Sequence, residues 1–131
     1  MGQLPSRKPS ATSNRVAVLK RLSSHNIVIA NQGEIARYLD GHAQLGKLLP
    51  RICAKVRKDF GAEVELALEL YKDPEIDDRY LTLYVRVPEY DAEILQRIDD
   101  ATDRFDQQIA KATGYLLITT DFRRPRGENA V

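Results

Sequence analysis

Oxygen ligands of the kind that magnesium and calcium prefer gather in one stretch of the chain. That stretch holds four carboxylates, Asp73, Glu75, Asp77 and Asp78, and a further carboxylate, Asp121, follows near the end of the chain. It has neither the glycine nor the terminal glutamate of an EF-hand loop. A solvated hairpin loop, in which Asp73 and Pro74 set a turn, is the favoured interpretation. We predict no metal and no cofactor, and we keep Asp77, Asp78 and Asp121 as an alternative metal set.

Nucleophiles and general bases are sparse in this chain. His25 and His42 are the only histidines, and neither has a neighbouring ligand at the spacing of a zinc site. No serine lies in a Gly-x-Ser-x-Gly turn. Cys53 falls on an apolar stripe, where a cysteine is an inert core residue. We therefore predict no catalytic residue.

Two runs of alternating apolar residues predict a β-hairpin with a readable outer face. The runs cover 63–71 and 80–87, and pairing Leu70 with Leu81 gathers their aliphatic side chains on one face. The other face then carries six candidates for binding a partner: Tyr71, Tyr80, Tyr84, Glu65, Glu69 and Arg86. In this register Tyr71 lies beside Tyr80, and Glu65 forms a cross-strand ion pair with Arg86.

This outer face favours a protein partner over RNA. Tyrosines on a sheet can stack bases, but the glutamates beside them would repel phosphates. Binding of a protein partner or self-association is the functional interpretation we prefer. An ordinary solvated face, or one covered by residues 14–30 of the same chain, is the alternative.

The two halves of the chain carry opposite charge. Residues 1–60 hold eleven Lys and Arg against three acidic residues, a net charge of +8, whereas residues 61–131 hold nine against sixteen, a net charge of −7. The candidates for an alternative nucleic-acid surface are Lys47, Arg51, Lys55, Arg57, Lys58, Arg123, Arg124 and Arg126. The opposing interpretation is that the two halves face each other in the fold or in a dimer.

Helical periodicity surrounds the predicted hairpin. Apolar residues between 45 and 60 form one stripe, with Pro50 predicting a kink or a break. A second stripe predicts one long helix over 91–112, followed by a strand over 115–122. Shorter signals indicate helices over 14–22 and 32–39 and an extended or strand segment over 26–30. The main order is α-β-β-α-β, which predicts an α+β two-layer sandwich with a small mixed sheet and helices on one face.

This order, over about residues 45–122, resembles the catalytic core of the nucleotidyltransferase fold. The resemblance implies metal-assisted phosphoryl transfer, and Asp121 would suit the family's late carboxylate. The catalytic motifs are absent: Lys72-Asp73-Pro74 stands where the family has a Gly-Ser turn, and Tyr80 and Thr82 stand where it has paired carboxylates. A degenerate nucleotidyltransferase-like protein is thus a further alternative function.

Length and composition predict one domain over 14–122, with a disordered tail over 1–13 and a disordered basic tail over 123–131. Of the 131 residues, 43% are hydrophobic and 30% charged, as in ordinary globular domains. A single cysteine and the lack of an apolar span favour a cytoplasmic protein. Gly2 fits a short myristoylation pattern, for which an unmodified tail is the favoured alternative. We expect a non-enzymatic interaction protein.

Overall fold

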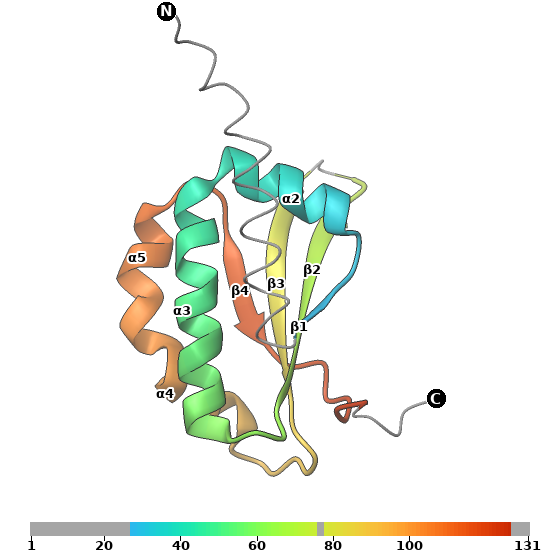
Figure 1. Ribbon diagram of the computed structural model, residues 1–131, viewed down its shortest axis with the longest axis vertical. Coiled ribbons are helices and arrows are strands. Elements are labelled where there is room, and N and C mark those ends of the chain that lie inside the picture. The colour runs from blue at the N-terminus through green and yellow to red at the C-terminus, as the bar shows by residue number, and fades with distance from the viewer. Residues whose placement is uncertain (1–26, 76–77, 127–131) are drawn as a thin grey trace, which may run out of the picture.

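The computed structural model describes residues 27–75 and 78–126, which form a four-stranded mixed sheet with a layer of helices. The elements are β1 (Ile27–Ile29), α2 (Gln32–Gly41), α3 (Ala43–Phe60), β2 (Glu65–Asp73), β3 (Asp78–Arg86), α4 (Ile94–Thr102), the 3₁₀ turn η2 (Asp103–Phe105), α5 (Asp106–Lys111) and β4 (Leu116–Thr119). Figure 1 shows α3, α4 and α5 together beside the sheet, with α2 across one end of it. The predicted α+β class is confirmed.

The strands lie in the order β1-β2-β3-β4, so each strand pairs with its neighbours in the sequence. The central pair β2–β3 is antiparallel, and it is flanked by the parallel pairs β1–β2 and β3–β4. The predicted hairpin register is confirmed: Leu70 is opposite Leu81, and Glu65 is opposite Arg86. Both strands extend beyond their predicted ends, to Asp73 and from Asp78, so the connecting loop is shorter than expected.

The core lies between the sheet and the helices. Leu66, Leu68, Leu81, Leu83 and Val85 point from the central strands toward the helices and are almost fully buried. The predicted stripe of α3 packs on them through residues that are also buried: Leu45, Leu48, Leu49, Ile52, Cys53 and Val56. Burial of apolar side chains on both layers is the main driving force for this arrangement. It also raises the pKa of the Cys53 thiol to about 12, so the thiol stays protonated at neutral pH.

Two helices differ from the expected pattern. Pro50 lies inside α3, which runs unbroken from Ala43 to Phe60, so the break that was one of our two expectations is absent. The predicted helix over 91–112 is instead divided into α4, η2 and α5. The Thr102 hydroxyl donates to the carbonyl of Ile98, at 2.9 Å, and such a bond to the preceding turn bends helices. The Asp91 carboxylate accepts from the Glu93 N–H at 2.9 Å, a local turn that delays the helix start to Ile94.

The ends of the domain differ from expectation as far as they are described. Within the predicted 26–30 segment, Ile27–Ile29 form strand β1, parallel to β2, which is one of our two expectations for it. The chain after β4 is ordered as far as Arg126, where a loose basic tail was expected from residue 123. The predicted helix over 14–22, the 1–13 tail, Gly2 and residues 127–131 lie outside the described residues. Within 27–75 and 78–126, the helices are too short or too polar for any of them to cross a bilayer.

Candidate functional site

The outer face of the sheet, opposite the helices, brings together the six residues that the sequence predicts for partner binding. Alternation along β2 and β3 places Glu65, Glu69 and Tyr71 there with Tyr80, Tyr84 and Arg86. No helix within residues 27–75 and 78–126 covers this face. The six residues do not form one cluster, however. Tyr71 and Tyr80 form an aromatic group at the hairpin end, Glu65 and Arg86 form a charged group at the opposite end, and Glu69 and Tyr84 lie between the two.

The aromatic group is a tyrosine row, Tyr71, Tyr80 and Tyr115, that crosses β2, β3 and the start of β4. The ring centroids of Tyr71 and Tyr80 are 4.9 Å apart, and those of Tyr80 and Tyr115 are 5.8 Å apart with an edge-to-face arrangement. Tyr71 is 45% exposed and Tyr115 is 52% exposed. Sequence analysis missed Tyr115, although pairing of β4 beside β3 in register would have put it next to Tyr80.

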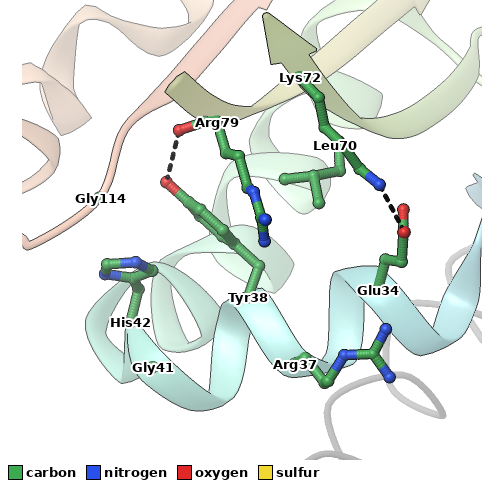
Figure 2. A pocket seen from close by; sticks show the side chains of 9 residues that line it. All are labelled: Glu34, Arg37, Tyr38, Gly41, His42, Leu70, Lys72, Arg79 and Gly114. Carbon is green, nitrogen blue, oxygen red and sulfur yellow. Dashed lines mark hydrogen bonds and ion pairs between the residues drawn. The ribbon is translucent and has the colours of Figure 1, made fainter. Parts of the chain in front are cut away.

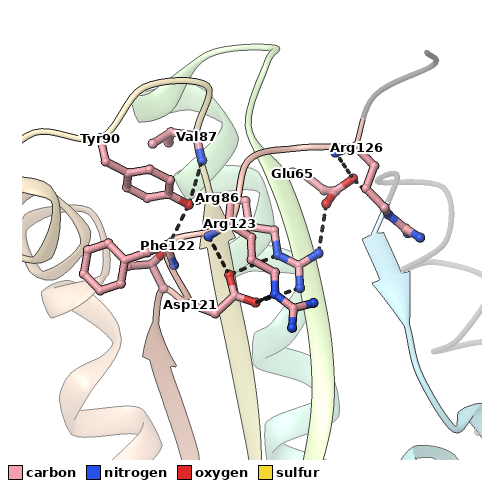
Figure 3. Close-up of polar contacts among 9 residues, drawn as sticks. Glu65, Arg86, Val87, Tyr90, Asp121, Phe122, Arg123 and Arg126 are labelled. Carbon is pink, nitrogen blue, oxygen red and sulfur yellow. Dashed lines mark hydrogen bonds and ion pairs between the residues drawn. The ribbon is translucent and has the colours of Figure 1, made fainter. Parts of the chain in front are cut away.

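The charged group is centred on Arg86, which is only 8% exposed (Figure 3). Its guanidinium donates to Asp121 through Nε at 3.2 Å and Nη2 at 2.8 Å, and to Glu65 through Nη1 at 2.9 Å. The predicted Glu65–Arg86 ion pair therefore exists, and Asp121 extends it to the end of β4. Two-point contact between a guanidinium and a carboxylate is among the stronger polar interactions in proteins.

These contacts set the protonation of the group. Burial is the largest influence on Asp121 and opposes its ionisation, but hydrogen bonds from Arg86 and the Arg123 N–H outweigh it, so the pKa of Asp121 lies below its ordinary value. The hydrogen bond to Asp121 is also the main reason why the pKa of Arg86 is raised. At neutral pH the group therefore holds one cation between two carboxylates. It is an ion-pair network centred on Arg86.

The chain that follows β4 is fastened to this network. The Arg126 N–H donates to Glu65 at 3.2 Å, and the Arg123 N–H donates to Asp121 at 3.2 Å. The Tyr90 hydroxyl adds a bond to the Arg123 carbonyl, and it also accepts from the Val87 N–H at 3.3 Å. The side chains of Arg123 and Arg126 remain 75% and 61% exposed. The segment therefore presents two cationic side chains from a fixed backbone.

A hollow of about 200 Å³ lies on the outer face between the two groups. Its lining includes the apolar side chains of Val28 and Ala67 and the polar side chains of Glu69, Tyr84 and Arg123. Burial and the neighbouring Glu69 carboxylate raise the pKa of the Tyr84 phenol, which keeps it a neutral hydrogen-bonding group. A cavity of roughly 150 Å³ can hold a benzene ring. The hollow is therefore large enough for one aromatic side chain.

The eight basic candidates for nucleic-acid binding do not form one group. Five lie on α3, on the helix side of the sheet, whereas Arg123 and Arg126 pair with Asp121 and Glu65 at the outer face. On α3 itself Lys55 pairs with Asp59, and Arg57 donates to the carbonyl of Val64 at 3.3 Å. The exposed members that remain are Lys47, Arg51 and Lys58 on α3, and Arg124 after β4.

The alternative metal set is not brought together either. Asp78 begins β3, whereas Asp121 binds Arg86 at the other end of the same strand. Nine residues of strand span about 25 Å, far beyond the reach of two ligands on one ion. Asp77 lies outside the described residues, and among the described ones no three carboxylate, histidine or cysteine side chains are grouped as metal ligands. The partner of Asp121 in the structure is the Arg86 guanidinium.

Comparisons with protein-family models, with curated proteins and with solved structures returned no match. The interpretation of the outer face therefore depends on its own geometry.

Proposed function

We propose that this protein is a non-enzymatic interaction domain that self-associates by stacking the outer faces of two sheets. The observation that carries the proposal is the exposed tyrosine row on a sheet face that no described helix covers. Tyrosine supplies a large contact area at a low cost in side-chain entropy and is enriched at the centres of interfaces. In a monomer, about half of the surface of Tyr71 and Tyr115 stays exposed to water, and association would bury it.

A second copy suits this face because the two ends of the face are complementary. The hairpin end offers Glu69 and aromatic rings, and the opposite end offers the exposed guanidiniums of Arg123 and Arg126. A two-fold axis through the face would set each end against the other end of the partner. Guanidinium groups then lie over tyrosine rings, and a tyrosine of one copy can enter the hollow of the other.

Stacking of faces is favoured over joining of sheet edges. The edge strands β1 and β4 have three and four residues, so they offer few free backbone groups to a further strand. The outer face measures about 20 by 30 Å from strand spacing and rise. Ala67 and Thr82, in the middle of this face, are already buried in the single chain, so two such faces bury at most about 1,000 Å² in total, which is near the lower limit for a specific interface. We therefore expect reversible association in the micromolar range.

Sedimentation velocity of the full chain over a wide concentration range tests the proposal. We expect the sedimentation coefficient to rise with concentration toward that of a dimer. Tyr115→Ser should weaken association by about tenfold or more, as loss of a central aromatic does in other interfaces. Leu95→Ser is the matched control, because Leu95 is 50% exposed but lies on α4 in the helix layer.

Two outcomes would overturn the proposal. A sedimentation coefficient that stays at the monomer value at every concentration excludes self-association. Equal weakening by Leu95→Ser and Tyr115→Ser would locate the contact elsewhere or make it non-specific.

A further inference from the structure

A pocket lies on the helix side of the sheet, between α2 and the hairpin end of β2 and β3 (Figure 2). Its volume is about 650 Å³, within the range of small-molecule sites. The lining residues are Glu34, Arg37, Tyr38, Gly41, His42, Leu70, Lys72, Arg79 and Gly114. Leu70 and the Tyr38 ring supply apolar wall, and the rest of the lining is mostly polar.

The sheet contributes two cations to this pocket in an unfavourable arrangement. Lys72 and Arg79 occupy the same face as the core leucines, and they are directly opposite each other on β2 and β3. Like charges at directly opposite positions destabilise a strand pair. On each strand the row of inward-facing aliphatic residues is followed by a cation, at the end of the sheet that α2 crosses. Core packing does not require these two cations, because the core ends at Leu70 and Leu81.

The helix adds one anion and a third cation. Glu34 accepts from Lys72 Nζ at 2.5 Å, and this bond is the main reason why the pKa of Glu34 is lowered. Arg37 and Arg79 both act on the same carboxylate electrostatically, but within the described chain neither guanidinium is paired with a carboxylate of its own. In Figure 2 Arg79 extends from β3 between Tyr38 and Leu70, toward α2. The pocket therefore has two positive charges more than its own residues neutralise.

The walls of the pocket are held in place by contacts of their own. The Tyr38 hydroxyl accepts from the Tyr115 N–H at 3.0 Å and donates to the Arg79 carbonyl at 3.4 Å, which joins α2 to β3 and β4. His42 Nδ1 lies 2.9 Å from the Thr113 hydroxyl. Gly114 passes so close to both side chains that an added Cβ would be 2.8 Å from His42 and 2.9 Å from Tyr38. The Arg79 guanidinium thus faces a cavity with fixed walls, whereas Arg37 lies at its rim and extends away from Arg79 along α2 (Figure 2).

We propose that this pocket binds a small molecule that carries a phosphate group, with Arg79 as its main ligand and Arg37, at the rim, as a second cation near the bound anion. The planar guanidinium donates two parallel hydrogen bonds to phosphate, which is why arginine is preferred for this anion. A dianion beside Arg79 also neutralises the excess charge and offsets the repulsion between the cations at the opposite positions Lys72 and Arg79. The volume exceeds that of a phosphate ion, so the remainder of the ligand has room beside Leu70 and Tyr38.

Titration calorimetry of the full chain with inorganic phosphate, AMP and adenosine tests this proposal, at low and at physiological ionic strength. We expect saturable binding of phosphate or AMP and none of adenosine. Arg79→Gln should weaken that binding by about tenfold or more and Arg37→Gln by several-fold, since each removes a charge-assisted contact. Arg104→Gln is the matched control, because it makes the same change in net charge at an exposed position on η2.

Two variants separate ligand binding from folding. Glu34→Gln should strengthen phosphate binding several-fold, because it frees Lys72 to act as a third ligand. Arg79→Gln should raise the urea midpoint of the ligand-free protein slightly, because it removes a like-charge contact while it abolishes binding. A general loss of structure would instead lower the midpoint.

The proposal is overturned if neither phosphate nor AMP binds at low ionic strength, or if adenosine alone binds. It is also overturned if Arg79→Gln and Arg104→Gln weaken binding equally, which would indicate only general attraction of anions. The pocket opens on the helix side of the sheet, so these results are independent of whether the outer faces self-associate.

Discussion

At Gly114 an unusual backbone conformation coincides with close packing. Its φ of +77° is in the left-handed region, and a Cβ there would collide with His42 and Tyr38. We expect Gly114→Ala to lower the free energy of unfolding by about 2 kcal/mol or more, since strain and overlap both add to the cost. Urea denaturation measures this.

Gly33→Ala is the control for that substitution. Gly33 lies in the first turn of α2, and an added Cβ meets nothing within 4 Å. Alanine there should leave stability unchanged or raise it by up to about 1 kcal/mol, as expected for an exposed helical site. Equal losses of unfolding free energy in Gly114→Ala and Gly33→Ala would show that the close contacts of Gly114 are not the reason for the cost.

At the scale of single residues, the sequence predicted best where one local pattern decides the outcome. Tyr71, Tyr80 and Arg86 were found because alternation in two adjoining runs sets both faces together. Lys72 and Arg79 were assigned to a loop, although they continue the same alternation by one step on each strand. Arg37 could not have been linked to them, because only the path of α2 brings it to that end of the sheet.

The segment after β4 depends on one side chain from another element. Arg86 is buried between Glu65 and Asp121, and these carboxylates in turn hold the N–H groups of Arg126 and Arg123. Arg86→Met would remove the cation that the two largely buried carboxylates share and leave only their longer contacts with Arg123 and Arg126. We expect a loss of about 3 kcal/mol in unfolding free energy, measured by urea denaturation at neutral pH. Arg124→Met, at an exposed position of the same segment, should cost almost nothing.

The same variant should change how stability depends on pH. Because the pKa of Asp121 is lowered in the folded protein, its contribution is complete above the unfolded value of about 4 and is lost as pH falls through the lower folded value. Wild type should therefore lose stability on acidification in this range. Arg86→Met should lose less stability over the same range, because the Arg86 hydrogen bonds that lower the pKa of Asp121 are gone. An acid dependence identical to that of wild type would contradict this assignment.

At the scale of elements, periodicity predicted the hairpin and α3 but did not predict interruptions. The stripe over 91–112 continues through α4 and α5, because Ile98, Phe105 and Ile109 all reach the core. The 3₁₀ turn between them depends on a hydroxyl-to-carbonyl bond that an apolar pattern does not reveal. The order after β4 was missed for a similar reason: its polar residues indicate a tail unless their partners on β2 and β3 are known.

At the scale of the whole molecule, the basic helix of the first half and the acidic helices of the second half lie side by side in the helix layer. The basic helix α3 packs against α4, and Arg51 of α3 lies 5.7 Å from the centre of the Phe105 ring in η2. The exposed faces of α4, η2 and α5 include Asp99, Asp100, Asp103 and Asp106. We expect these carboxylates to weaken the field that Lys47, Arg51 and Lys58 present to a polyanion.

Fluorescence anisotropy of short labelled DNA and RNA measures this directly. We expect no binding at physiological ionic strength and at most weak, salt-sensitive binding at low ionic strength, since few phosphates can be contacted together. Tight binding that Lys47→Gln and Lys58→Gln remove would instead restore the nucleic-acid alternative.

The arrangement of the strands also has a consequence for how the chain reaches this fold. The central hairpin joins neighbours in the sequence, whereas β1 reaches β2 only across α2 and α3, and β4 reaches β3 only across α4 and α5. Closing such long connections costs chain entropy, so the hairpin is the part that can form first. On the ribosome β1 emerges before its partner has been made. The first described strand to be synthesised must therefore wait for the middle of the protein before it has a place in the sheet.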